Sequence, residues 1–386
     1  MDRKISLKQR IKTGCVTVLY YCFRIFPIKK NKILIRNYYG KGFGDNAKYI
    51  AYELLKQNQK YDIVWEVADM NDVMPEGIRK TQYRSLRGLY DICTARVWLD
   101  NCRKGGYVRK RKGQYYIQLW HGDIGIKKVE RHVEHQLTPE YVEAAKNDSK
   151  MADLFVSGSR WLTHIYKDAF WYDGEIAEVG SPRCDILTRN DISQKQQIRT
   201  KLGVADDVKI VLYAPTFRNT GDDMSVYELP WNELLNVLEK RFGGNWIGAL
   251  RLHPNVSEYS HKLDLPENVV DVTAYDDMQE LLLISDCLIS DYSSCLYEFA
   301  RGGKVGFIFA SDYDSYKKER DVYFDLYDTP FPVAQDAGSL ICNIDGFDSD
   351  EYNAKRKDFF EDKFGSVITD KSSYWVAKRI EDVCNS

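Results

Sequence analysis

The sequence lacks the short motifs that mark several common classes of enzyme. It has no G-x-x-x-x-G-K-[ST] loop, which argues against nucleotide hydrolysis of the Walker type, and neither G-x-S-x-G nor H-E-x-x-H occurs. Its one D-x-D, at 348–350, lies in a polar stretch that predicts a turn. We therefore expect neither a metal nor a cofactor in the site.

The nine cysteines are scattered, with no C-x-x-C pair and no regular spacing. Neither a zinc site nor a disulfide framework is therefore indicated. Several cysteines lie inside apolar runs, where the residue behaves as a small hydrophobe, and a reducing cytoplasm is the expected compartment.

No hydrophobic run near the N-terminus is long enough to cross a bilayer. The uncharged stretch 13–23 has eleven residues, about half of the ~20 that a spanning helix needs, and no small-residue cleavage site follows it. Residues 1–32 carry nine lysines and arginines against the single acid Asp2. The pattern predicts a basic amphipathic helix over 1–30 that lies on the cytoplasmic face of a membrane. A helix packed on its own domain is the alternative.

The length of 386 residues, with 44% hydrophobic and 29% charged side chains, predicts a folded protein of two domains. Nucleic-acid binding is not expected, because the net charge is −2 and no recognition motif occurs.

Short apolar runs alternate with helical patterns along the chain, which predicts two α/β lobes. In the first lobe, 31–188, the expected strands are KNKILIRN after Pro27, then 62–67, 95–101, 115–120 and 154–159. In the second lobe, 189–386, the expected strands are 209–214, 246–252, 268–273, 287–291 and 305–310, and a C-terminal helix completes it. Ligands bind at the carboxyl ends of such strands, so we predict a site in a cleft between the lobes.

The clearest motif is W-H-G-D at 120–123, which directly follows a predicted strand. His121 would therefore face the cleft, and with an ordinary pKa near ~6.5 it suits removal of a proton from an attacking hydroxyl. Gly122 lets a phosphate or backbone approach closely, while Lys127 and Lys128 supply charge. A packed histidine at a tight turn is the alternative.

Two motifs in the second lobe follow predicted strands in the same way. In R-L-H-P-N at 251–255, Arg251 and His253 suit phosphate binding and stabilisation of a leaving group. In S-D-Y-S-S at 290–294 a strand turns into a helix, whose first N–H groups and dipole favour a pyrophosphate. Glu298, one turn further, is expected to accept hydrogen bonds from a ribose or from the transferred alcohol. A simple serine N-cap is the alternative reading of the serines.

Two further arginines, Arg218 in A-P-T-F-R and Arg183 in G-S-P-R-C-D, stand at strand exits. Phosphate contact is plausible for both, and a surface salt bridge is the alternative.

In this order the segments resemble the CDP-glycerol glycerophosphotransferase family of wall teichoic acid and capsule synthesis, over about residues 26–335. The segments are FPIKKNKI, IQLWHGDIGIKK, GSPRCDIL, LYAPTFR, LRLHPN, DDMQELLLISDCLISDYSSCLYEFA and ERDVYFDLYD. The resemblance implies two Rossmann-like lobes in a glycosyltransferase-B-type architecture. It also implies transfer of glycerol phosphate from CDP-glycerol, the donor substrate, to a lipid-linked or polymeric acceptor, with release of CMP.

The resemblance further implies roles for single residues. His121 would be the base on the acceptor hydroxyl, and His253 would contact the donor pyrophosphate on the second lobe. The other implied donor-binding residues are Thr216, Arg218, Arg251, Ser290, Asp291, Ser293, Ser294, Glu298 and Arg320. The implied acceptor-binding residues on the first lobe are Gly42, Asp45, Asn46, Gly122, Asp123, Lys127, Lys128 and Arg183.

The sequence departs from the family pattern at 123–125, where we expect Thr-Pro-Leu, and at Ser290, where we expect threonine. The expected partners are a CDP-activated polyol, a lipid-linked saccharide or polyol-phosphate acceptor, and the membrane surface. The alternatives are a CDP-ribitol-dependent transferase, a nucleotide-sugar glycosyltransferase and a non-catalytic assembly scaffold. The presence of both histidines argues against the scaffold.

Overall fold

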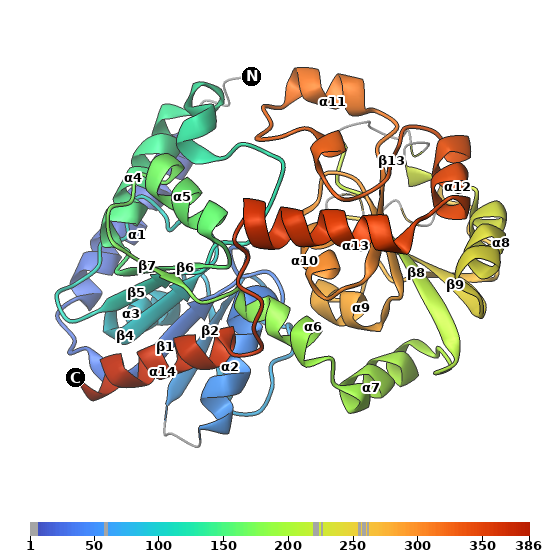
Figure 1. Cartoon of the computed structure of the whole chain (residues 1–386). Helices are drawn as coiled ribbons and strands as arrows, with labels where there is room; N and C mark the ends of the chain where they lie inside the picture. Colours follow the sequence, from blue (N-terminus) through green and yellow to red (C-terminus); the bar gives the residue numbers. More distant parts are fainter. Residues whose placement is uncertain are drawn as a thin grey trace.

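Two parallel α/β lobes lie side by side in the computed structural model (Figure 1). It describes residues 7–57, 61–218, 224, 227–253, 256, 260 and 262–386, with the backbone alone for 7–13 and 319. The first sheet has the strand order β3-β2-β1-β4-β5-β6-β7, and the second has the order β10-β9-β8-β11-β12-β13. All strand pairs named in these sheets are parallel, which confirms the predicted fold class.

The first sheet is covered by helices on both faces. Its strands are β1 (Lys29–Arg36), β2 (Asp62–Val67), β3 (Ile78–Gln82), β4 (Ala95–Asp100), β5 (Tyr115–Gln118), β6 (Leu154–Ser157) and β7 (Glu175–Glu178). Its helices are α1 (Leu7–Phe23), α2 (Asp45–Lys56), α3 (Leu86–Thr94), η1 (Glu130–Gln136), α4 (Pro139–Met151) and α5 (Arg160–Ala169). Successive residues of a strand point to opposite faces, so Ile33 and Ile35 of β1 pack with α2 while Leu34 packs with α1 and α3.

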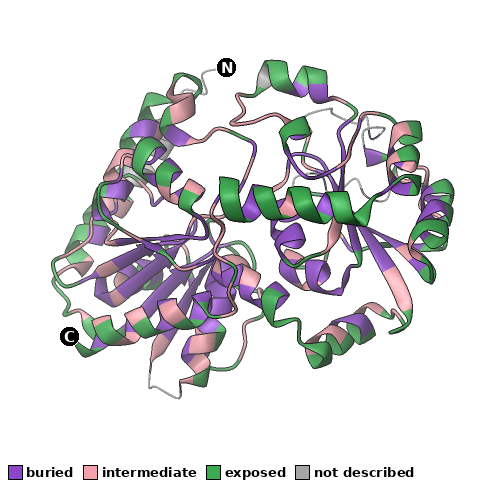
Figure 2. Ribbon diagram, viewed as in Figure 1, coloured by how far each residue is buried: buried purple, intermediate pink, exposed green. Residues whose placement is uncertain are grey.

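The second lobe repeats this plan. Its strands are β8 (Val208–Ala214), β9 (Asn245–Leu250), β10 (Val269–Asp271), β11 (Cys287–Ser290), β12 (Val305–Phe309) and β13 (Val333–Ala334). Its helices are α7 (Ile192–Leu202), α8 (Trp231–Phe242), α9 (Met278–Ile284), α10 (Ser294–Arg301), α11 (Tyr313–Glu319), α12 (Ala337–Asp345) and α13 (Ser349–Lys357). Central strands of both sheets are buried on both faces, as Figure 2 shows, and their near-continuous apolar sequences follow from this.

The C-terminal helix α14 (Ser372–Asn385) packs on the first lobe rather than the second. Val376, Ala377 and Ile380 join the core beneath α2, and the first N–H groups of α14 donate to the Asp185 carboxylate at 3.1 and 2.7 Å. The predicted second lobe, 189–386, is therefore wrong in its last segment. Amphipathic spacing predicts the helix but does not say which sheet its apolar face covers.

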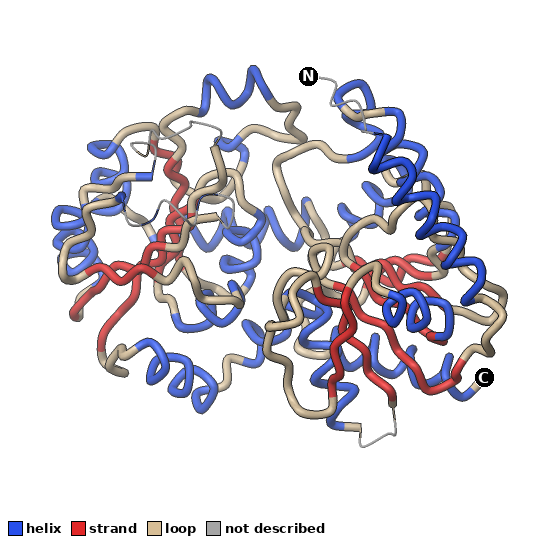
Figure 3. The backbone as a smooth tube through the Cα atoms, turned by 180° about the vertical axis from the view of Figure 1, so that it is seen from behind, coloured by secondary structure: helices blue, strands red, loops and turns tan. Residues whose placement is uncertain are grey.

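The N-terminal helix α1 runs along the outside of the first lobe, seen from behind in Figure 3. Tyr20 is buried against α3 and donates its hydroxyl to the Arg109 carbonyl at 2.6 Å, whereas Val18 and Tyr21 are 64% and 50% exposed. The helix thus packs on its own domain through one face and leaves a second apolar face open. Residues 1–6 of the predicted membrane helix lie outside the described residues. Within the described part of the chain, no helix is long and apolar enough to cross a bilayer.

Candidate active site

His121 lies just after β5, at the carboxyl edge of the first sheet. Its ring stacks on Trp120 with centroids 4.3 Å apart and lies 5.4 Å from the ring of Tyr38, which follows β1. Trp120 has a φ of +49°, a left-handed conformation that turns the chain sharply at the end of the strand. The imidazole is therefore held between two aromatic rings at the predicted edge of the cleft.

One hydrogen bond defines which nitrogen of His121 can accept a proton. Nδ1 lies 2.7 Å from the carbonyl oxygen of Asn101. A carbonyl only accepts, so Nδ1 carries the hydrogen and Nε2 keeps its lone pair. Burial lowers the pKa of His121 below the ordinary histidine value. The side chain is therefore neutral near pH 7 and ready to act as a base.

Sequence analysis missed Asn101, although it stands at the end of the predicted strand 95–101. Its side chain accepts from the backbone N–H of Tyr38 at 2.9 Å and donates to Asn37 at 2.7 Å. Asn101 could have been predicted as His121 was, because residues at the carboxyl ends of parallel strands line the ligand site.

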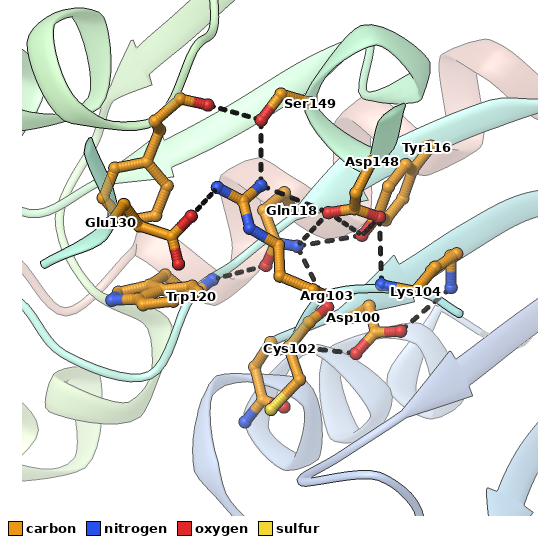
Figure 4. A network of polar contacts seen from close by, with 12 residues as sticks. Asp100, Cys102, Arg103, Lys104, Tyr116, Gln118, Trp120, Glu130, Asp148 and Ser149 are labelled. Atoms are coloured by element: carbon orange, nitrogen blue, oxygen red, sulfur yellow. Dashed lines mark hydrogen bonds and ion pairs between the residues drawn. The ribbon is translucent and has the colours of Figure 1, made fainter. Parts of the chain in front are cut away.

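A buried polar network behind His121 fixes the loop that follows β4 (Figure 4). Arg103 pairs with Glu130 at 2.7 Å and donates to Ser149 at 2.9 Å, while Lys104 pairs with Asp100 at 2.9 Å. Buried charges that are paired in this way are costly to disturb. The Asn101 carbonyl therefore has a fixed position against the imidazole.

Three buried sets of ion pairs join the two lobes, and we call them the inter-lobe ion pairs. They are Lys48 with Asp277 and Glu280, both at 2.6 Å; Arg183 with Asp45 at 2.6 Å and Glu298 at 2.5 Å; and Arg301 with Asp123 at 2.5 Å. Arg183 also donates to the carbonyl of His121 at 3.0 Å. The second lobe is thus tied directly to the loop that carries His121.

Five of the residues that were predicted to bind a ligand have partners within the protein. Asp123 also accepts hydrogen bonds from Ser159 and Ser181 at 2.9 and 2.8 Å. Burial alone would raise the pKa of Asp123, but Arg301 more than offsets this, so the pKa lies below the usual range. Asn46 accepts from the Arg183 N–H at 3.1 Å and donates to the Trp120 carbonyl at 3.2 Å. Asp123, Arg183 and Glu298 join the two lobes, while Asp45 and Asn46 hold Arg183 within the first lobe. Their partners are distant in sequence, so the motifs could not reveal this.

On the second lobe, the N-terminus of α10 follows the carboxyl end of β11. Ser293 is the N-cap and accepts from the Cys295 N–H at 3.4 Å, and both Ser293 and Ser294 are half-buried. Ser290 differs from its prediction: it is fully buried and donates its hydroxyl to the Ala214 carbonyl at 2.6 Å. Only the later two serines of the motif are available to a ligand.

Arg218 connects the segments that follow β8, β11 and β12, beside this helix. It pairs with Asp291 at 2.7 Å and with Asp312 at 2.6 Å, while the Thr216 N–H donates to Asp291 at 3.0 Å. Tyr292 donates to Asp312 at 2.9 Å. Thr216, Arg218 and Asp291 were predicted to bind the donor, and the structure joins them to one another, with Asp312 as the partner that sequence analysis missed.

Four cationic or titratable side chains interact with one another, and we call them the donor-side cations: Lys127, Arg251, His253 and Arg320. Lys127 and His253 also interact with Asp291, Arg251 with His253, and Arg320 with Lys127. Burial lowers the pKa of Lys127, and Arg218 and Arg320 lower it further against the opposing effect of Asp291. Burial, Lys127 and Arg251 all lower the pKa of His253. Among the described residues, no carboxylate forms an ion pair with Lys127, Arg251 or Arg320. This positive cluster suits an anionic ligand.

Lys127 reaches the second lobe because its loop pairs with the segment after α11. The Lys128 N–H donates to the Asp321 carbonyl at 3.0 Å, and the Tyr323 N–H donates to the Ile126 carbonyl at 2.8 Å. The Lys127 ammonium lies 5.7 Å from the Tyr316 ring. Lys127 was predicted on the acceptor side and lies instead with the donor-side cations.

Three predicted residues remain. Gly42 lies in an exposed turn with a φ of +70°, and Gly122 and Lys128 are half-buried. Pro254 and Asn255 of the R-L-H-P-N motif lie outside the described residues.

The two sides of the cleft are close to one another. Burial lowers the pKa of Arg251, and the nearby Asp277 and Tyr38 act to raise it. Tyr38 belongs to the first lobe, and its ring contacts His121. Two α/β lobes that meet at the carboxyl ends of their strands, with a basic imidazole on one side and an anion site on the other, define a transferase of the glycosyltransferase-B type.

Residues 18–382 match the family described as CDP-Glycerol:Poly(glycerophosphate) glycerophosphotransferase, and the chain belongs to this family. The family predicted from the motifs is thus confirmed.

Known relatives agree with this assignment. The teichoic acid poly(glycerol phosphate) polymerase of Staphylococcus epidermidis is 32% identical over 92% of this chain, which spans about half (51%) of that protein. The teichoic acid glycerol-phosphate transferase of Staphylococcus aureus is 28% identical over 97% of this chain and 99% of its own. The solved structure of the wall teichoic acid polymerase TagF has a TM-score of 0.83 at 29% identity, with 99% of both chains covered. A variant of that polymerase has been soaked with CDPG.

Proposed function

We propose that this chain transfers glycerol phosphate from CDP-glycerol to a hydroxyl of a polymeric or lipid-linked teichoic acid acceptor and releases CMP. The observation that carries the proposal is a neutral His121, with its proton on Nδ1, after β5 of the first lobe, together with a group of cations at the strand ends of the second lobe. Membership of the glycerophosphotransferase family supports the choice of substrates.

In the proposed reaction the acceptor hydroxyl oxygen attacks the β-phosphorus of CDP-glycerol. A new P–O bond forms, the bond from that phosphorus to the oxygen bridging to CMP breaks, and CMP leaves with the electron pair. His121 Nε2 takes the hydroxyl proton. The reaction needs no cofactor, and the protein contributes mainly positioning and electrostatic stabilisation.

The second lobe has groups that fit the departing nucleotide. Negative charge grows on the bridging oxygen as CMP leaves, and Lys127, Arg251 and Arg320 would stabilise it. His253 lies among these cations and would contact the diphosphate. The free N–H groups at the start of α10, beside Ser293 and Ser294, would bind the same anion.

The proposed acceptor is built at a membrane, and α1 offers the means of attachment. Val18, Tyr21, Ile25 and Phe26 are 64%, 50%, 81% and 40% exposed, and the exposed Lys29 and Lys30 follow at the start of β1. We therefore propose a peripheral position on the cytoplasmic face of the membrane. In vesicle co-sedimentation, Val18→Glu with Ile25→Glu should lose binding to anionic vesicles that the unsubstituted protein retains; equal binding by both would contradict this.

The activity test is CMP release from CDP-glycerol by the purified full chain, with and without a glycerol-phosphate-primed acceptor. We expect acceptor-dependent release, and weaker or no release when CDP-ribitol replaces CDP-glycerol. Faster release from CDP-ribitol would make the chain a ribitolphosphotransferase. No release from either donor by folded protein would contradict the proposal.

A further inference from the structure

A continuous row of aromatic and arginine side chains leads from α1 to His121, and we call it the tyrosine–arginine ladder. Its contacts, in order, are Tyr20 to the Tyr107 ring at 5.8 Å, Tyr107 to Arg84 at 5.5 Å, Arg84 to Tyr83 at 5.0 Å, Tyr83 to Arg36 at 5.4 Å and Arg36 to Tyr39 at 5.8 Å. Tyr38, the neighbour of Tyr39, completes it at 5.4 Å from His121. None of these contacts belongs to the donor site.

The ladder follows the carboxyl edge of the first sheet. Tyr38 and Tyr39 come after β1, Tyr83 and Arg84 come after β3, and Tyr107 lies in the loop after β4. This edge is where open α/β sheets bind ligands. The ladder therefore extends the site from His121 toward the outer edge of the lobe.

The backbone of the ladder is strained, which is typical of binding sites. Tyr38, Tyr39 and Arg84 have φ angles of +38°, +60° and +59°, values that side chains other than glycine rarely adopt. Such conformations persist only where surrounding contacts impose them, and they cluster at functional sites. Here the Tyr38 N–H is held by Asn101, and the loop carrying Tyr107 follows the network of Figure 4.

Arg84 is the charged group of the ladder that faces solvent. Arg36 is buried and paired with Asp100, whereas Arg84 is exposed and, among the described residues, has no carboxylate partner. Tyr39 is 51% exposed. A guanidinium held between two tyrosine rings, beside exposed aromatic faces, suits a phosphodiester joined to polyol or sugar units.

We propose that the tyrosine–arginine ladder binds the acceptor, with Arg84 on a phosphate of the growing chain. The tyrosines that reach solvent, Tyr38, Tyr39, Tyr83 and Tyr107, would lie against its carbon backbone, while the buried Tyr20 anchors the ladder to α1. The proposal rests on the proposed function, because it treats His121 as the end of the ladder where the reacting hydroxyl arrives. It also explains the position of α1: an acceptor anchored in a lipid surface beside Tyr20 would pass along the ladder to the base.

The test measures binding of a short glycerol-phosphate oligomer to the full chain without donor, so that it does not depend on turnover. We expect Arg84→Ala to raise the Kd about tenfold, as for one lost charge-assisted contact. Arg87→Ala is the matched control: it removes the same charge three residues away, where Arg87 lies over Tyr90 and pairs with Asp91 at 3.1 Å. Equal weakening by both variants would mean unspecific attraction and would overturn the proposal.

Tyr39 gives a second, charge-free test. Tyr39→Phe should keep the affinity for the oligomer, whereas Tyr39→Ala should weaken it several-fold, because the ring face is lost. Unchanged binding in both Arg84→Ala and Tyr39→Ala would overturn the ladder, as would a wild-type protein that does not bind the oligomer.

Two further measurements separate the ladder from its neighbours. In CMP release, Arg84→Ala should raise the KM for the acceptor and leave the KM for CDP-glycerol unchanged; a rise in the donor KM alone would overturn the proposal. Arg84→Ala should bind vesicles of phosphatidylcholine and phosphatidylglycerol as well as the wild type does. If vesicle binding weakened as much as oligomer binding, Arg84 would bind lipid headgroups and the proposal would be overturned. If the wild type binds the oligomer but releases no CMP, the proposed function fails while the ladder stands.

Discussion

The inter-lobe ion pairs and the donor-side cations use the same types of residue at the same cleft for different purposes. Lys48, Arg183 and Arg301 have side chains only 5–7% exposed, each with a carboxylate at 2.5–2.6 Å. Lys127, Arg251 and Arg320, in contrast, form no ion pair with a carboxylate among the described residues. The first set is neutralised by the protein and fixes the lobes, whereas the second leaves positive charge for a ligand to neutralise.

This difference shows how two arginines from equally good motifs come to have different roles. Motif position brings both Arg183 and Arg251 to strand exits, but only Arg183 finds carboxylates, Asp45 and Glu298, on both lobes. A buried charge that loses its partner is strongly destabilising, while an unpaired cation at a cleft costs little until its ligand is removed. Stability and donor affinity should therefore respond to different substitutions.

The largest expected effect is on the base. His121→Ala should lower kcat about 10²–10⁴-fold, the usual contribution of a general base, and should leave CDP-glycerol binding nearly unchanged. His164→Ala, at an exposed histidine on α5, is the control and should retain activity. A His121→Ala enzyme within about tenfold of the wild type would remove His121 from the chemistry.

Substitutions in the inter-lobe ion pairs should lower the free energy of unfolding. Asp123→Ala leaves Arg301 buried without its partner, so the free energy of unfolding should fall by about 3–5 kcal/mol in denaturant titration. The exposed pair Lys240–Asp345, at 2.7 Å, is the control, and Asp345→Ala should cost about 0–1 kcal/mol. Equal losses in the two variants would erase the distinction between buried and exposed pairs.

Substitutions of the donor-side cations should lower the affinity for CDP-glycerol. Lys127→Ala should weaken CDP-glycerol binding about tenfold in calorimetry, while unfolding stays within about 0.5 kcal/mol of the wild type. The exposed Lys355→Ala on α13 provides a lysine control outside the cleft. A loss of stability without a loss of affinity would place Lys127 with the inter-lobe pairs.

The smallest effect is on the pH profile. Burial lowers the pKa of His121, so the protonated, inactive form accumulates only at pH values below the ordinary ~6.5. We therefore expect kcat/KM for the donor to be level near pH 7 and to fall as the pH drops through that lowered pKa. An acid limb centred above ~6.5 would contradict the role of burial at His121.

Sequence patterns predicted the central strands of both sheets and the edge strand β10, and missed the other edge strands, β3, β7 and β13. The runs at 62–67 and 287–291 correspond to β2 and β11, since continuous apolar residues are typical of central parallel strands. β3 has the polar sequence I-R-K-T-Q at the edge of its sheet, and β13 has two residues. Neither carries an apolar signal.

At the site, too, local sequence patterns predicted only part of the arrangement. His121 and Arg251 were found because strand ends mark the cleft, but the sequence does not show what else lies there. Asp123 follows His121 by two residues, yet Arg301 on the other lobe decides its role. The proton on Nδ1 of His121 likewise depends on a carbonyl twenty residues away, at Asn101. Long-range partners, absent from local patterns, set these roles.

The most direct test of the central claim is a single-turnover experiment with CDP-glycerol and a defined acceptor. We predict that the wild-type protein releases one CMP for each glycerol phosphate added to the acceptor, and that His121→Ala binds the donor but does neither. CMP release without extension of the acceptor, or extension at the wild-type rate by His121→Ala, would contradict the account.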